Sequence, residues 1–191
     1  MADGSEIDVS QDTDAALCER AADGCRASFE ALLNRHYDRI YQTAWRFCGA
    51  AAMAEDVTQD VVVKIAKAIR GFRGEAAFTT WVYRITYTTA IDCLRAAQRT
   101  EAVAPSNLMT LVDTMPETLR PITPEEAVIN TDLWAAVLGL SEKQRDAVLL
   151  VYAEDLSHAR AAEVMGCSEK TVSWHLFEAK KRLKVKLEAQ G

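Results

Sequence analysis

The stretch that decides the fold is residues 156–183, LSHARAAEVMGCSEKTVSWHLFEAKKRL. It predicts a helix, a tight turn and a second helix. Gly166 stands where the first helix must end in a left-handed conformation, which glycine adopts without a steric penalty. Ser168 follows at a position from which its side chain can cap the first free amides of the next helix. We therefore expect a helix-turn-helix motif over these residues.

The second helix of this motif is amphipathic. Apolar side chains that would face a core recur at helical spacing, at Val172, Leu176, Ala179 and Leu183. The side chains left on other faces are Lys170, Ser173, Trp174, Phe177 and Lys181. Such a helix can lie in the major groove of DNA.

The charge of residues 170–186 favours a nucleic-acid role over a merely structural helical hairpin. Glu178 is the only acidic residue there, against the cations Lys170, Lys180, Lys181, Arg182, Lys184 and Lys186. A cationic strip of this kind suits contacts with phosphates. The alternative, two packed helices with a solvated lysine-rich face, stays open from the residues alone.

The overall composition fits a globular protein of one or two small helical domains. The chain has 191 residues, and its hydrophobic fraction of 49% is enough to form a core in each domain. The formal net charge of -6 argues against a protein that coats nucleic acid indiscriminately. Residues 1–34 hold eight acidic residues against two basic ones, so their excess alone equals the net charge.

Other classes of protein find little support. No apolar run reaches the roughly 18 residues needed to span a bilayer, and the acidic start lacks the features of a signal peptide, so we expect a cytoplasmic protein without direct membrane insertion. The five cysteines form no CxxC pair and are odd in number, which fits reduced thiols. The three histidines show no metal-ligand spacing with them, so we expect neither a metal site nor a cofactor.

The first part of the chain predicts an acidic tail followed by a helical domain. We interpret residues 1–24 as a mobile acidic tail with room for a short helix at 15–22, and residues 25–100 as the first domain. A helix from about Phe29 should close at Gly49. In the next helix the four-residue spacing of Val57, Val61, Ile65 and Ile69 marks the buried side. On the residues alone, the polar side chains on its other face are favoured to be simply solvated.

A third helix is expected from Phe78 to Arg99, after a glycine-containing loop at 71–77. Phe78, Val82 and Ile85 can pack inward. The aromatic residues Trp81, Tyr83 and Tyr87, near several arginines, suit unstacked bases of single-stranded nucleic acid. Packing of at least some of these aromatic side chains in the core is the favoured interpretation.

The remaining segments predict a linker and a second domain. Residues 101–130 contain all four prolines of the chain and several acidic residues, which prevents a continuous helix. Fully stretched, roughly 30 residues could span on the order of 100 Å. Residues 131–191 form the second domain, in which Ser141 and Gln144 have the spacing of a capping box. The predicted fold is all-α, with two small helical domains joined by a flexible linker.

Three blocks in this order give the sequence its resemblance to a known family. They are residues 54–60 (AEDVTQD), residues 78–85 (FTTWVYRI) with 90–95 (AIDCLR), and residues 140–145 (LSEKQR) ahead of the helix-turn-helix. Over about residues 25–187 the sequence is similar to extracytoplasmic-function (ECF) sigma factors, the compact bacterial initiation factors that keep only the second and fourth sigma regions. More faintly, it resembles the members that govern resistance to cobalt and nickel.

The resemblance implies three sets of contact residues. The outward face of the second helix would dock on the coiled coil of the polymerase clamp, through Asp56, Gln59 and Asp60. The loop and third helix would capture a flipped base of the minus-10 element and help to melt the duplex, through Arg73, Thr79, Trp81, Tyr83, Arg84, Tyr87, Thr88 and Arg95. The helix-turn-helix would read the minus-35 element, with Ser168, Lys170, Thr171, Ser173, Trp174 and His175 near the groove and Lys180, Lys181 and Arg182 toward phosphates.

The same resemblance implies partners and an unusual promoter. The partners would be core RNA polymerase, contacted at its beta-prime clamp and beta flap, promoter DNA, and a membrane-anchored anti-sigma factor that holds the chain inactive. The regulon would serve a stress or metal response. Members commonly have Arg-Asn where this chain has Tyr87-Thr88, and basic residues at Ser173, His175 and Glu178. Fewer cations in the reading helix imply weaker nonspecific binding to DNA.

Two competing functions fit the sequence less well. A stand-alone helix-turn-helix regulator would explain the second domain but leave residues 54–95 unexplained. An enzyme with a cysteine nucleophile lacks support, because no Cys and His stand in an adjacent motif context and no glycine-rich phosphate loop occurs. We therefore expect an initiation factor without catalytic residues.

Overall fold

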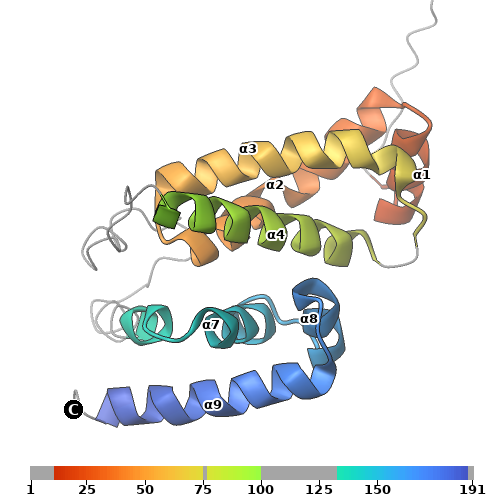
Figure 1. The fold of residues 1–191 in the computed structure, drawn as a ribbon. Coiled ribbons are helices and arrows are strands. Elements are labelled where there is room, and N and C mark those ends of the chain that lie inside the picture. Colours follow the sequence, from red (N-terminus) through yellow and green to blue (C-terminus); the bar gives the residue numbers. More distant parts are fainter. Residues whose placement is uncertain (1–10, 75–76, 100–132, 189–191) are drawn as a thin grey trace, which may run out of the picture.

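A computed structural model describes residues 11–74, 77–99 and 133–188. Every regular element within these ranges is helical, which confirms the predicted all-α class (Figure 1). In addition to a short helix at 133–138, the elements are α1 (Asp14–Ala22), α2 (Arg26–Cys48), α3 (Ala51–Ala68), η1 (Ile69–Gly71), α4 (Phe78–Arg99), α7 (Glu142–Val148), η3 (Leu149–Ala153), α8 (His158–Met165) and α9 (Glu169–Glu188).

The first domain is a bundle of α2, α3 and α4. The predicted stripe on α3, which continues into the first residue of η1, is buried, with at most 3% exposure at Val57, Val61, Ile65 and Ile69. Helix α2 ends where the sequence indicated, because Gly49 adopts the left-handed conformation with φ 68° and its amide bonds to the carbonyl of Trp45. Helix α4 begins at Phe78, as predicted.

Helix α1 agrees with the short helix expected at 15–22, but its packing corrects our interpretation of these residues as part of a mobile tail. Thr13 caps the helix by accepting a hydrogen bond from the amide of Ala16. Leu17, Cys18 and Ala21 lie on one side and are buried against the first domain. The spacing of these three residues forms an apolar stripe. Its burial was not predicted from the sequence, because the residues around it are acidic. The first ten residues, which also belong to the predicted tail, lie outside the described ranges.

The second domain contains the predicted helix-turn-helix in α8 and α9. Gly166 ends α8 with φ 64°, and the amide of Cys167 bonds to the carbonyl of Ala162 at 3.0 Å. Ser168 caps α9, since its hydroxyl accepts the amide of Thr171 at 3.1 Å. Val172, Leu176 and Ala179 are buried, as their spacing predicted.

The capping box predicted at Ser141 and Gln144 was wrong. Ser141 occupies the N-cap position of α7, but its side chain makes no capping hydrogen bond. Gln144 is 4% exposed and therefore faces the protein interior rather than the start of the helix. Its Oε1 atom has no hydrogen-bond partner among the residues that the structure describes.

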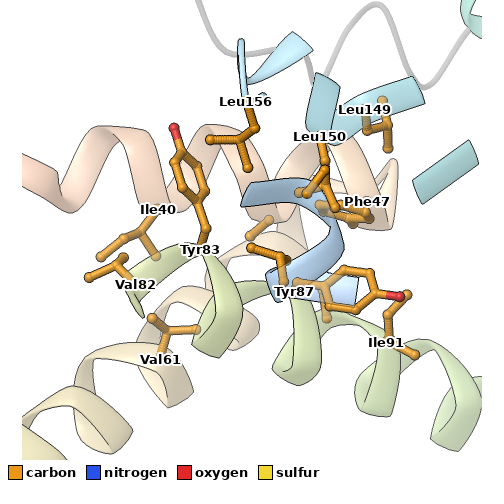
Figure 2. Packing of buried hydrophobic residues seen from close by; sticks show 14 of the residues in the cluster. Ile40, Phe47, Val61, Val82, Tyr83, Tyr87, Ile91, Leu149, Leu150 and Leu156 are labelled. Atoms are coloured by element: carbon orange, nitrogen blue, oxygen red, sulfur yellow. The ribbon is translucent and has the colours of Figure 1, made fainter. Parts of the chain in front are cut away.

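The two domains pack directly on each other. Figure 1 shows α4, in green, between the rest of the first domain and the blue helices of the second. One apolar cluster runs through both domains: Figure 2 shows Tyr83 and Tyr87 of α4 together with Leu150 and Leu156 of the second domain. The residues expected to form a linker, 101–130, lie outside the described ranges. The sequence predicted two separate modules, whereas the structure has them docked.

Candidate functional site

An acidic face lies on the outer side of α3. Asp56, Gln59 and Asp60 are exposed there, opposite the buried stripe, because positions three and four apart share one side of a helix. Cys93 of α4 lies close enough for both carboxylates to raise the pKa of its thiol, after the larger effect of burial. The helical period therefore places these three predicted residues together on open surface.

Aromatic rings hold the segment that joins α3 to α4. Phe72, which follows η1, packs on Trp81 with ring centroids 5.0 Å apart and on Phe78 at 5.9 Å. Trp81 is half-buried in this cluster. The adjacent Arg73 remains exposed. The cluster thus fixes the start of α4 and leaves a cation at its edge.

A cavity of about 400 Å³ opens beside this cluster, within the usual range for small-molecule sites. Arg73 and Thr79, two of the predicted minus-10 residues, line it. Helix α1 supplies Asp14, Cys18 and Glu19 to the opposite wall. Sequence reasoning missed this wall, because it assigned α1 to the tail.

The middle of α4 has two sides. Arg84 and Thr88 face solvent, whereas Tyr83 and Tyr87 are each only 5% exposed. Burial raises the pKa of both tyrosines, with Glu154 adding to the effect at Tyr83 and Asp146 at Tyr87. The aromatic side chains of α4 therefore serve packing, as favoured from the residues alone.

Further along α4, Arg95 is exposed and pairs with a carboxylate of the second domain. Its guanidinium lies 2.9 Å from Glu142. The structure thus brings Arg73, Thr79 and Trp81 together at one end of α4. It turns Tyr83, Tyr87 and Arg95 toward the second domain.

The outer face of α9 carries most of the residues predicted to read DNA. Exposed side chains there are Ser168 at the turn, then Lys170, Ser173, Trp174, Lys180, Lys181 and Arg182. Thr171 is half-buried, and its hydroxyl lies 2.8 Å from that of Ser168. Phe177 shares this face at 66% exposure, one turn beyond Trp174 at 57%. The spacing had placed Phe177 outward, but sequence reasoning gave it no role.

His175 is turned partly inward on the same helix. It is half-buried, and its Nδ1 atom is buried with no partner in the described part of the chain. Burial, followed by the charge of Lys143, lowers the pKa of the imidazole. Because its ring is half-buried, His175 is less accessible to a DNA groove than the exposed Lys170 and Trp174.

The described ranges contain neither a candidate metal centre nor a membrane-spanning helix. No cluster of three or more His, Cys, Asp or Glu side chains there could hold a metal ion. None of the helices in those ranges is long and apolar enough to cross a membrane.

Comparison with known proteins found two matching family models and several similar proteins. Residues 32–100 match sigma-70 region 2, and residues 131–183 match sigma-70 region 4. The ECF RNA polymerase sigma-E factor of Haemophilus influenzae is 31% identical over 186 residues, which cover 92% of this chain and 96% of that protein. The RNA polymerase sigma-H factor of Pseudomonas aeruginosa is 32% identical over 184 residues, covering 92% and 94%.

Two solved structures share the fold. CnrH in complex with the cytosolic domain of CnrY superposes with a TM-score of 0.69 at 23% identity, covering 93% of this chain and 99% of that one. The sigma factor RpoE in complex with the anti-sigma factor NepR from Bartonella quintana gives a TM-score of 0.64 at 22% identity, covering 84% and 96%.

Proposed function

This chain belongs to the ECF sigma factors of the sigma-70 family. From that premise we propose which of its surfaces binds core RNA polymerase and which bind promoter DNA during transcription initiation. It is an alternative sigma factor. The observation that carries the proposal is that one chain presents an exposed acidic face on α3 and an exposed cationic face on α9. The first suits a protein partner and the second suits DNA.

The acidic face of Asp56, Gln59 and Asp60 docks on the beta-prime clamp of core RNA polymerase, and the second domain contacts the beta flap. Asp60→Arg should weaken binding to core polymerase by about tenfold or more, since bringing like charges together at an interface costs several kcal/mol. Fluorescence anisotropy of the labelled chain against core polymerase, without DNA, measures this affinity. Asp92→Arg makes the same charge reversal at an exposed position of α4 and should leave the affinity unchanged. Equal affinities for wild type and Asp60→Arg would remove the clamp role.

Promoter DNA is contacted by both domains. The cavity lined by Arg73 and Thr79 accepts an extruded base of the minus-10 element, and Trp81, Arg84 and Thr88 continue this surface along α4. We assign Tyr83, Tyr87 and Arg95, on the side of α4 that faces the second domain, to the same element. The outer face of α9 enters the major groove at the minus-35 element, where Lys170, Ser173 and Trp174 face base edges. Lys180, Lys181 and Arg182 then meet phosphates.

Regulation follows the pattern of the family. Two solved structures with this fold contain a bound partner, the cytosolic domain of CnrY in one and the anti-sigma factor NepR in the other. We infer that this chain works in the cytosol, is held inactive there by a membrane-anchored anti-sigma factor, and catalyses no reaction of its own.

Reconstituted transcription tests the function as a whole. The purified chain is added to sigma-free core polymerase on fragmented genomic DNA of its source, and the transcript starts are sequenced. Discrete starts that share a minus-10 and a minus-35 element are expected. Absence of specific starts from folded protein would favour a stand-alone regulator, which should instead bind duplex DNA tightly without polymerase.

A further inference from the structure

Helix α1 gives the cavity at the start of α4 an acidic wall. Figure 1 shows α1 beside the turn that leads from α3 to α4. Asp14 and Glu19 line the cavity from this helix, opposite Arg73. After the larger effect of burial, the charges of Asp14 and Glu19 raise the pKa of the Cys18 thiol, so both carboxylates lie near the same part of the wall. Sequence reasoning gave neither acid a role, because both lie in the segment predicted as a tail.

Contacts at both ends hold α1 against the rest of the first domain. Near its start, Asp14 lies 2.7 Å from Nε2 of His36 and 3.3 Å from the guanidinium of Arg35. Near its end, the guanidinium of Arg20 donates to the hydroxyl of Ser28 at 3.0 Å. The wall is therefore a fixed element, on which a polar side chain keeps a defined position toward a bound molecule.

The two carboxylates of the wall differ in what they can still accept. Both oxygens of Asp14 are engaged, Oδ1 by Arg35 and Oδ2 by His36. The side chain of Glu19 is exposed, and within the described ranges it forms no hydrogen bond or ion pair. An ionised carboxylate accepts hydrogen bonds and donates none. Glu19 is thus an acceptor that a molecule in the cavity can use.

The other walls supply donors and aromatic surface. Arg73 is exposed at the rim, and its guanidinium only donates. Phe72 and Phe78 also line the cavity, with their ring centroids 5.9 Å apart in an edge-to-face arrangement. Enzymes that bind an extruded base recognise it by stacking on aromatic or apolar side chains and by hydrogen bonds to its edge. This cavity offers both, with an acceptor on one wall and a donor on the opposite one.

The four DNA bases present different groups to a carboxylate. Adenine, cytosine and guanine each carry an exocyclic amino group, which donates. Thymine has no amino group, and its ring N–H lies between two carbonyl oxygens that repel an approaching carboxylate. A site built to hydrogen-bond a substrate rejects an analogue without the matching group far more strongly than an apolar pocket does.

We propose that Glu19 selects the extruded base: its carboxylate accepts a hydrogen bond from the exocyclic amino group of adenine, cytosine or guanine, and it excludes thymine from the cavity. The proposal deepens the proposed function and rests on it, since it takes the cavity as the site of the extruded minus-10 base. Arg73, on the opposite wall, donates to the acceptor atom that lies next to the amino group in each of these bases. Helix α1 thereby becomes a determinant of promoter specificity.

Binding of short single strands to the full chain tests the proposal without polymerase. The probes are four fluorescein-labelled thymidine pentanucleotides whose central base is thymine, adenine, cytosine or guanine. The residues that line the cavity in the described part of the chain all belong to the first domain, so the probes can reach it in the free protein. By fluorescence anisotropy, wild type should bind each amino-bearing probe at least about tenfold more tightly than the all-thymine probe, as expected for one hydrogen bond to a charged group.

Three substitutions locate the preference. Glu19→Gln replaces the carboxylate by an amide that donates as well as accepts, so the all-thymine probe should gain affinity and the preference should disappear. Glu19→Asp keeps a carboxylate and should keep the direction of the preference. Asp23→Asn removes an exposed carboxylate at the end of the same helix, outside the cavity lining, and should bind all four probes as wild type does. Circular dichroism verifies that each variant is folded.

Three results would overturn the proposal. The first is equal binding of the four probes by wild type. The second is a preference that Glu19→Gln leaves unchanged. The third is failure of the folded chain to bind any probe, because the cavity is open in the free protein.

The transcription experiment reports separately on the proposed function. Specific starts together with equal binding of the four probes would leave the sigma function standing and refute the role of Glu19. Absence of specific starts, together with an amino preference that Glu19→Gln removes, would refute the sigma function and leave a base-binding cavity controlled by Glu19.

Discussion

At the level of single residues, Gly166 fixes the angle between α8 and α9. Its φ of 64° is left-handed, and a Cβ added there would meet nothing within 4 Å. The effect of a side chain is therefore conformational rather than steric. Gly166→Ala should lower the free energy of unfolding by about 1–2 kcal/mol, measured by urea denaturation. Gly71→Ala, which also points into open space but without a left-handed φ, should change it by no more than about 0.5 kcal/mol.

The cysteines differ in reactivity because their surroundings differ. The hydroxyl of Ser28 donates to the sulfur of Cys25 at 3.3 Å and, as the leading cause, lowers the pKa of that thiol. Burial raises the pKa of Cys18 to about 11 and that of Cys48 to about 12. Near neutral pH, Cys25 should react first with Ellman's reagent and Cys18 and Cys48 only after unfolding. Cys25→Ser should abolish the fastest phase; an unaltered fast phase would contradict the assignment.

Much at this level could be predicted from sequence, because it depends on near neighbours. Gly166, Ser168 and Gly49 act within one turn of their own helix ends, and each does what its residue type indicated. The capping box at Ser141 failed for a tertiary reason. Burial of Gln144 overrode a local preference that the spacing alone had suggested.

Among the elements, α1 shows how composition can mislead. Its acidic surroundings indicated a tail, yet Leu17 is 0% exposed and the helix lines the cavity beside Arg73. Leu17→Ala should destabilise the first domain by about 2–5 kcal/mol, the usual range for a buried leucine. Val63→Ala, at a position that is 48% exposed, should change stability by no more than about 0.5 kcal/mol. Equal unfolding midpoints for Leu17→Ala and wild type would show that α1 is not part of the cooperative unit.

The longer helices were predictable because their periodicity is strong. The stripe on α3 and the inward face of α9 followed from spacing alone, and so did the outward position of Asp56, Gln59 and Asp60. The helical periodicity does not predict the function of these outward residues. On their own they fitted a solvated face, and their assignment to polymerase stays a prediction that rests on family resemblance.

For the whole molecule, docking of the domains should depend on pH through Asp146. Desolvation raises the pKa of its carboxyl above the ordinary 3.8, against lowering contributions from Tyr87, Lys143 and Arg145 and a raising one from Glu142. Between the ordinary pKa and the raised pKa, the carboxyl of Asp146 is therefore protonated when the domains are docked and ionised when they are separated. Docking should be strongest below the ordinary pKa and weaken as pH rises through the raised one.

Solution scattering of the full chain across this acidic range measures the effect. Wild type should expand as pH rises through the raised pKa of Asp146. Asp146→Asn, which cannot titrate there, should lose that part of the change. Identical pH profiles for the two proteins would exclude Asp146 as the responsible group.

The docking of the second domain on the first could not be predicted from the sequence. The pairs Tyr87 with Asp146 and Thr43 with Glu154 join residues 59 and 111 positions apart, and no periodicity links such positions. The proline-rich segment between the domains suggested independence. Buried Tyr83 and Tyr87 were the available hint, since three aromatic side chains on one helix exceed what one helix face usually buries.

The pairing of Glu154 with Thr43 and Arg46 has a consequence for genetics. A substitution that removes the Arg46 guanidinium leaves the Glu154 carboxylate buried without the cation that pairs with it. Second-site suppressors of such a change should therefore arise at Glu154 itself, 108 positions further along the chain, through substitutions that remove the carboxylate. Recovery of suppressors within α2 alone would show that the pairing contributes nothing to the fold.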